Sequence, residues 1–275
     1  MEKASVVLIS GCSSGIGLAL AREFASRGCR VFATARKPEV IESLKQEKME
    51  TAALDVTDSD SIEACVREVI GKAGRIDVLV NNAGYMQMGP VIDISTDDLR
   101  RQFDTNVFGA AALTRAVAPH MIKKRSGLIV NIGSVSGICA TPFAGVYCAT
   151  KAAMHLLSDS LRMELAPFNI AVIVVQVGAI KSNIGEAAIK NIIETKNSVY
   201  APLIEYIKAR AVASQKDPTP AEEFSKVLVG KLSRAKIPKI IRIGKESKRM
   251  PFYKKLPVDL VDRLMSKAFG LDKLK

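Results

Sequence analysis

Short apolar segments alternate with helical segments along most of the chain, and this alternation constrains the fold more than any other feature. Seven segments have the length and composition of buried strands: residues 6–10, 30–35, 51–55, 76–81, 127–132, 170–177 and 239–243. Helical patterns fall between them at residues 15–28, 39–47, 59–72, 96–124 and 220–233, and in a segment around Tyr147 that ends near Pro167. Strands connected through helices form right-handed crossovers in a parallel sheet. We predict an α/β fold, with about seven parallel strands in one doubly wound domain and helices on both faces.

Length and composition agree with one large globular domain over residues 1–275, because the chain is 48% hydrophobic and shows no repeat or linker. The alternation loosens at residues 178–220, which we predict to form a substrate loop or lid. The longest mostly apolar run, residues 170–180, is shorter than the roughly 18 residues that a membrane span needs. A strand pattern begins at Ser5 without a charged and apolar leader, so we expect no signal peptide and a cytoplasmic location.

The five cysteines are odd in number and form no Cys-x-x-Cys pair, which predicts reduced thiols. The chain has only two histidines, and neither clusters with cysteine, so no metal site is expected.

Positive charge is concentrated in the last quarter, where residues 201–275 carry 18 Lys and Arg against 8 Asp and Glu. No aromatic platform or nucleic-acid reader motif accompanies this charge, so no nucleic-acid partner is predicted. Residues 250–275 form a basic amphipathic C-terminal extension. Its apolar face either packs on the fold or contacts a partner or an anionic membrane surface, and peripheral membrane contact stays open as an alternative.

A glycine-rich turn lies between the first strand and the first helix. It contains Gly11, Ser13, Ser14, Gly15, Ile16 and Gly17, with the spacing Gly-x-x-x-Gly-x-Gly. Free amides and the positive end of a helix attract a pyrophosphate at such a turn. We predict that it binds a dinucleotide.

Arg36 follows the second strand, where an acidic residue would bind the ribose of NAD and an arginine accommodates the 2′-phosphate of NADP. A guanidinium can bind that phosphate with two hydrogen bonds, so the predicted cofactor is NADP(H). The alternative is a solvated surface arginine beside Lys37.

Tyr147 and Lys151 are four residues apart, which places them on one face of a helix. An adjacent ammonium group lowers the pKa of a phenol, so we expect Tyr147 to exchange a proton with a substrate oxygen.

These motifs together resemble the short-chain dehydrogenase/reductases, a Rossmann-fold family. The resemblance covers about residues 4–182, and it rests on Gly11-x-x-x-Gly15-x-Gly17, the Asn81-Asn-Ala-Gly84 segment, Asn106, Ser134 and Tyr147-x-x-x-Lys151. The glycine-turn sequence Gly-Cys-Ser-Ser-Gly-Ile-Gly, together with Thr-Ala-Arg after the second strand, is most similar to the branch with 17β-hydroxysteroid dehydrogenases, retinol dehydrogenases and acyl-dihydroxyacetone-phosphate reductases.

The resemblance implies a role for each matching residue. Tyr147 would donate a proton to a carbonyl oxygen while NADPH delivers hydride, Lys151 would hold the nicotinamide ribose, and Ser134 would bind the carbonyl oxygen. Asn106 would fix a water that links Lys151 to solvent. The further cofactor-binding residues implied are Asp55 and Val56 beside the adenine, and Asn82, Ala83, Gly84, Gly178, Ile180 and Ser182. A homodimer or homotetramer, formed through the Tyr147 helix and the long helix before it, is also implied.

Three positions depart from the family pattern: Ser10 replaces a common Thr, Val177-Gly178 replaces Pro-Gly, and Ser182 replaces a Thr that often binds the cofactor amide. Loss of the proline is expected to remove some rigidity beside the nicotinamide.

Apolar residues around the expected site predict a small lipophilic ketone or secondary alcohol as substrate. They are Tyr85, Met86, Met88, Ile138, Pro142 and Phe143 near the centre and Ile184, Ile189, Ile192, Ile193, Val199, Tyr200, Leu203 and Ile207 in the lid. Two other functions remain open: a non-catalytic NADP(H)-binding sensor or scaffold, and an α/β-hydrolase in which Ser13 of Gly11-Cys-Ser-Ser-Gly15 is the nucleophile.

Overall fold

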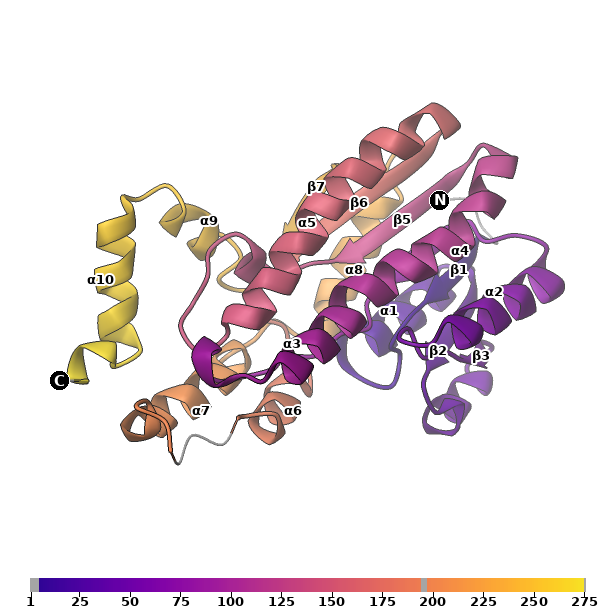
Figure 1. The fold of residues 1–275 in the computed structure, drawn as a ribbon. Coiled ribbons are helices and arrows are strands. Elements are labelled where there is room, and N and C mark those ends of the chain that lie inside the picture. The colour runs from indigo at the N-terminus through magenta and orange to yellow at the C-terminus, as the bar shows by residue number, and fades with distance from the viewer. Residues whose placement is uncertain (1–4, 194–196, 275) are drawn as a thin grey trace.

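A seven-stranded parallel sheet forms the centre of the molecule, as predicted. The computed structural model describes residues 5–193 and 197–274. The strand order is β3-β2-β1-β4-β5-β6-β7 (Figure 1). The strands are β1 (Val6–Ile9), β2 (Arg30–Ala35), β3 (Glu50–Ala53), β4 (Val78–Asn81), β5 (Gly127–Ile132), β6 (Ile170–Val177) and β7 (Ile240–Ile243).

Helices cover both faces of the sheet (Figure 1). Helices α1 (Gly15–Ser26) and α8 (Ala221–Leu232) pack on one face, and α2 (Ser59–Ala73), α4 (Gly109–Lys124) and α5 (Gly145–Leu165) cover the other. Side chains of β1 alternate between the two cores, because Val7 and Ile9 pack under α1 and α8, whereas Leu8 points to the other face. Each buried aliphatic side chain contributes about 1.5–3 kcal/mol. This two-sided burial explains why the strands are continuously apolar.

Two predicted helices differ from the observed elements. Residues 39–47 were expected to be α-helical, but Pro38–Lys45 forms a 3₁₀ helix, η1, that is followed by Lys48 with φ +62°. Residues 96–124 were expected to form one helix, but α3 (Thr96–Phe103) and α4 are joined by a π-helical turn, η3 (Asp104–Phe108). The π turn fits a local requirement, because it is the segment from which Asn106 reaches the loop after β4. The hydrophobic periodicity of residues 96–124 did not reveal the π-helical turn, because one wider turn barely changes the spacing of the apolar residues.

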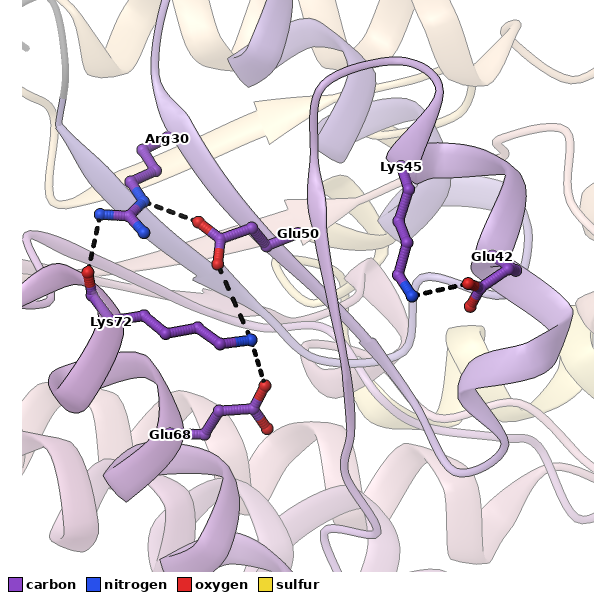
Figure 2. Close-up of polar contacts among 6 residues, drawn as sticks. All are labelled: Arg30, Glu42, Lys45, Glu50, Glu68 and Lys72. Carbon is purple, nitrogen blue, oxygen red and sulfur yellow. Dashed lines mark hydrogen bonds and ion pairs between the residues drawn. The ribbon is translucent and has the colours of Figure 1, made fainter.

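An ion-pair network ties β2, β3 and the end of α2 together at the amino-terminal edge of the sheet (Figure 2). The Arg30 Nε atom lies 2.7 Å from Glu50 Oε1, and the Lys72 Nζ atom lies 2.7 Å from Glu68 Oε1. Arg30 also donates a hydrogen bond to the Lys72 carbonyl oxygen at 3.0 Å. A separate pair, Lys45 and Glu42, lies within η1. Exposed pairs of this kind contribute at most about 1 kcal/mol each, and those of Arg30 and Glu50 lie at the edge opposite the carboxyl ends of the strands.

The segment after β6 folds into helices α6 (Ile184–Lys190) and α7 (Ile204–Val212), and the chain ends with α9 (Arg249–Tyr253) and α10 (Val258–Ala268). Residues 194–196 of the predicted lid and residue 275 of the extension lie outside the described residues. Phe143 lies between the two segments, with its ring centroid 6.2 Å from that of Tyr200 and 6.3 Å from that of Phe269. The C-terminal extension packs on α7, because Phe269 and Leu271 join the cluster that contains Ile207, and Lys273 lies over the Tyr206 ring at 5.1 Å. None of the helices within residues 5–193 and 197–274 has the length and apolar character to cross a bilayer.

Candidate active site

A cavity of about 1250 Å³ lies at the carboxyl ends of the strands, where β1 and β4 are neighbours. Ligands of open parallel sheets bind at this point, because the connections on either side leave a crevice between them. Among its lining residues are most of those singled out from the sequence: Gly11, Ser13, Ser14, Gly15, Ile16, Arg36, Asp55, Val56, Asn82, Ala83, Gly84, Ser134, Tyr147, Lys151, Gly178, Ile180 and Ser182. Gly17 and Asn106 do not line the cavity. Gly17 lies against Gly11, and Asn106 forms hydrogen bonds with Tyr85; both of these neighbours line the cavity.

The glycine turn brings the start of α1 against the end of β4. Gly11 has φ +74°, and a Cβ atom there would lie 3.0 Å from the Ala83 Cα atom. Ser14 precedes α1 without a side-chain cap, so its hydroxyl leaves the first helical amides available. A turn with close backbone approach and uncapped helical amides fits the pyrophosphate of a dinucleotide.

Ser10 and Asn82 hold this turn on the sheet. The Ser10 hydroxyl accepts hydrogen bonds from the amides of Asn82 (3.0 Å) and Ala83 (3.1 Å). The Asn82 side-chain amide donates to the carbonyl oxygens of Ser10 and Gly11, each at 2.9 Å. Ser10 therefore makes these hydrogen bonds with the hydroxyl group that it shares with the Thr common at this position in the family.

Arg36 and Asp55 lie at the carboxyl ends of β2 and β3. Burial raises the pKa of Asp55, but hydrogen bonds from the amide and hydroxyl of Thr57, at 2.9 and 2.7 Å, and the charge of Arg36 outweigh it, so the pKa lies below its usual range. Asp55 is therefore a carboxylate at neutral pH. Arg36 is exposed in the cavity wall, where an incoming phosphate can reach it.

Tyr147, Lys151 and Ser134 converge in the buried part of the cavity, with 9%, 7% and 7% of their surfaces exposed. Tyr147 and Lys151 come from the first two turns of α5, and Ser134 follows β5. The Lys151 Nζ atom lies 5.8 Å from the Tyr147 ring centroid and donates a hydrogen bond to the Ile132 carbonyl oxygen at 2.8 Å.

The protonation of this group differs from the sequence expectation, in which Lys151 lowers the pKa of Tyr147. Burial raises the pKa of Tyr147, and a hydrogen bond with Ser134 opposes this effect only in part. Burial also lowers the pKa of Lys151 from 10.5 to about 8. Desolvation disfavours the charged forms of both side chains, and the Lys151 Nζ atom lies 5.8 Å from the ring centroid, so the pKa of Tyr147 shifts in the direction opposite to the expected one. Tyr147 therefore carries its proton at neutral pH.

Asn106 positions the loop that follows β4. Its amide nitrogen donates to the Tyr85 carbonyl oxygen at 2.9 Å and to the Thr150 hydroxyl at 3.1 Å, while its oxygen accepts from the Tyr85 amide at 3.0 Å. Gly84 lies close to Lys151, because a Cβ atom added to Gly84 would lie 3.9 Å from Lys151 Nζ. Asn106 thus connects the π turn, α5 and the cavity wall near Lys151.

The Val177-Gly178 segment is held by the end of β7. The Gly178 amide donates to the Ile243 carbonyl oxygen at 2.9 Å, and the Ala179 amide donates to the Lys245 carbonyl oxygen at 2.8 Å. Backbone hydrogen bonds thus restrain this segment without the proline of the family pattern. Beyond it, the Ser182 amide donates a hydrogen bond to the Gln215 side chain at 3.0 Å, which holds Ser182 against the turn after α7.

Only some of the residues predicted to form the apolar lining do so. Tyr85, Met86, Ile184, Ile192 and Ile193 line the cavity. Met88, Phe143, Leu203 and Ile207 instead form the buried core of the lid, and Ile189 and Val199 are 45% and 71% exposed. Helical spacing alone does not separate a core-facing residue from a cavity-facing one.

Two parts of the cavity wall were missed in the sequence reading. Arg210 enters from α7, and Met265 and Phe269 enter from the C-terminal extension. Arg210 carries no local motif. The helical spacing of Met265 and Phe269 was visible, but which surface they cover depends on where α10 packs.

The comparisons with known proteins agree with this geometry. Residues 5–192 match the short chain dehydrogenase family. A short-chain dehydrogenase/reductase, GME11361, of Pestalotiopsis microspora is 36% identical, over 97% of this chain and 94% of its own length. The NADPH-dependent 1-acyldihydroxyacetone phosphate reductase of Schizosaccharomyces pombe is 33% identical, over 89% of this chain and 81% of its own.

A solved structure shares the fold over nearly the whole chain. The short-chain dehydrogenase from Streptomyces avermitilis superimposes with a TM-score of 0.82 at 32% identity, covering 99% of this chain and 98% of that one. Several other curated relatives are matched over only 61–64% of their own length. The family assignment makes this protein an oxidoreductase that uses a nicotinamide cofactor, and it replaces the hydrolase alternative built on Ser13. The chain belongs to the short chain dehydrogenase family.

Proposed function

We propose that this protein is an NADP(H)-dependent carbonyl reductase or alcohol dehydrogenase that acts on a lipophilic ketone or secondary alcohol of steroid, retinoid or acyl-lipid type. The observation that carries the proposal is the convergence of Ser134, Tyr147 and Lys151 in the buried part of a cavity that also contains the glycine turn. A binding-only sensor would need the glycine turn but not the three buried polar side chains. Burying such groups costs free energy, and buried titratable side chains that cluster in a cleft are typical of catalytic sites.

The residues have distinct roles in the proposed reaction. A bound nicotinamide cofactor would supply the hydride for reduction of the carbonyl carbon. Tyr147 carries its proton at neutral pH, as a phenol ordinarily does, and burial raises its pKa further; it gives this proton to the carbonyl oxygen. Ser134 holds that oxygen by a hydrogen bond, and Lys151 binds the cofactor ribose and stabilises the phenolate that proton transfer leaves on Tyr147. In the direction of oxidation, Tyr147 takes the proton back.

The glycine turn, Arg36 and Asp55 would hold the rest of the cofactor, with Asp55 and Val56 beside the adenine. Asn82, Ala83, Gly84, Gly178, Ile180 and Ser182 complete this part of the cavity wall. NADP(H) is favoured over NAD(H) by the exposed cation at position 36, and the related reductase of Schizosaccharomyces pombe is named for its NADPH dependence.

Replacement of Arg36 by Asp tests the cofactor assignment. A hydrogen bond to a charged group contributes about 1.5–3 kcal/mol, so NADPH affinity should fall about 10- to 100-fold, while NADH affinity changes little. The measurement is the dissociation constant of each cofactor by fluorescence titration. Lys37→Asp is the matched control, because Lys37 is an exposed cation one residue along and is not in the cavity wall. Equal losses in the two variants, or an unchanged preference in Arg36→Asp, would refute the assignment.

The function itself is tested by NADPH consumption across steroid, retinoid, acyl-lipid and simple ketones. We expect turnover with one lipophilic class and with the corresponding alcohol in the presence of NADP⁺. NADPH binding without turnover on any member of the panel would instead favour the sensor or scaffold.

We also propose that the protein is a homodimer or homotetramer and that it is cytoplasmic. Apolar side chains are exposed on the two helices that the resemblance implies for a homodimer or homotetramer: Leu156 (71%) and Met163 (62%) lie on α5, and Phe108 (60%) precedes α4. These support a contact between copies. The basic extension packs Met265 inward but leaves Val258 72% exposed, so peripheral contact of a cytoplasmic enzyme with a membrane stays a proposal.

A further inference from the structure

Arg210 is a cation in the cavity wall whose charge is balanced by no carboxylate among the described residues. It lies on α7, is partly buried, and its Nε atom donates a hydrogen bond to the Thr141 hydroxyl at 2.8 Å. Thr141 precedes α5, so this bond places the guanidinium next to the segment that carries Tyr147. Burial raises the pKa of Tyr147, and the positive charge of Arg210 opposes part of this effect.

Arg210 differs from the other cations around the cavity. Six cationic side chains line it: Arg36, Arg101, Lys151, Lys190, Arg210 and Arg249. Two are neutralised locally, because Arg101 pairs with Asp98 and Arg249 pairs with Glu246 at 3.2 Å. Arg36 and Lys190 are exposed to water, and the buried Lys151 donates to a backbone carbonyl oxygen.

Within residues 5–193 and 197–274, no carboxylate pairs with Arg210, and Thr141 is the acceptor of its one hydrogen bond. A guanidinium has five N–H donors, so the two terminal nitrogens remain available in a fork that matches a carboxylate or a phosphate. Burial lowers the pKa of Arg210, which is the sign expected for a cation withdrawn from water without an anion. An anionic group in the cavity would remove that penalty.

We propose that Arg210 binds an anionic group of the substrate, a carboxylate or a phosphate, and that the enzyme therefore acts on a lipophilic carbonyl compound that carries such a group near the reacting carbonyl. This inference rests on the proposed function, because it takes the cavity beside Tyr147 as the substrate site. Thr141 orients the guanidinium, and the apolar wall formed by Met86, Ile192 and Phe269 accommodates the rest of the molecule. An uncharged steroid or retinoid would leave Arg210 unpaired and is disfavoured.

The test measures binding without turnover, so its result does not depend on the proposed reaction. Octyl phosphate, octanoate and octanol are titrated calorimetrically into the full chain, with and without NADP⁺. NADP⁺ prevents the probes from occupying the glycine turn. Octyl phosphate or octanoate should bind at least about 10-fold more tightly than octanol, and Arg210→Gln should lose about 10- to 100-fold of that affinity. The stronger of the two anions identifies the group.

Lys208→Gln is the matched control, because Lys208 lies on the same helix, is exposed and pairs with Glu205. Arg210→Lys should keep part of the affinity, since it restores the charge without the fork. Equal binding of octanol and both anions to the wild-type protein would overturn the proposal, and this comparison needs no variant to fold. Unchanged anion affinity in a folded Arg210→Gln protein would overturn it as well. A protein that binds the anions through Arg210 but reduces no carbonyl would contradict the proposed function alone.

Discussion

Tyr147→Phe should bind NADPH as the wild-type protein does and yet lose turnover by about 10²- to 10⁴-fold, the usual contribution of a positioned general acid. The substitution removes one oxygen atom from a side chain that is 9% exposed and keeps the ring in place. Its structural cost is the hydrogen bond with Ser134, about 1 kcal/mol. The loss should therefore appear in kcat while the NADPH dissociation constant stays within about a factor of two of the wild-type value.

The measurement pairs a fluorescence titration of NADPH with single-turnover kinetics on the best substrate of the panel. Tyr206→Phe is the control, because it removes the same atom from a lid tyrosine that is not in the cavity wall. Full activity in Tyr147→Phe would show that the proton comes from another group. A loss of NADPH affinity equal to the loss of turnover would assign the phenol to cofactor binding and not to proton transfer.

Gly17→Ala should abolish useful cofactor binding, although Gly17 does not line the cavity. An added Cβ atom would lie 2.2 Å from the Gly11 carbonyl oxygen and 2.5 Å from the Asn82 side-chain nitrogen. These two atoms are hydrogen-bonded to each other at 2.9 Å, so the methyl group must separate the glycine turn from β4. Overpacking of this kind costs about 1–3 kcal/mol. Loss of two hydrogen bonds to a pyrophosphate would lower NADPH affinity by at least about 100-fold.

Gly71→Ala is the matched control for this substitution. Gly71 is exposed within α2, and an added Cβ atom meets no other atom within 4 Å. Because glycine destabilises a helix interior, this variant should gain about 0.5–1 kcal/mol in the free energy of unfolding and bind NADPH normally. Urea denaturation and fluorescence titration measure the two quantities. Wild-type affinity in Gly17→Ala would show that the turn tolerates displacement from β4 and would contradict this account.

Sequence reasoning succeeded where the signal is local and periodic. The strands and their order along the chain follow from short apolar runs, and the parallel sheet follows from the helices that connect them. The glycine turn and the Tyr147-Lys151 spacing are also local, because a turn and one helical turn fix which atoms can be neighbours. The assembly of these motifs in one cavity follows from the sheet topology.

Tertiary structure decided what depends on burial and on contacts between distant residues. The ammonium of Lys151 was expected to lower the pKa of Tyr147, but only the folded cavity shows that desolvation raises it. Arg210 and Thr141 are 69 residues apart in the chain, and no spacing rule connects them. The sequence by itself determined the fold and predicted the residues of the candidate site, because local patterns mark the strands, the glycine turn and the Tyr147-Lys151 spacing. Tertiary packing decided the protonation of Tyr147 and the placement of Arg210 next to the segment that carries it, because packing alone sets how much water and which distant side chains reach each group.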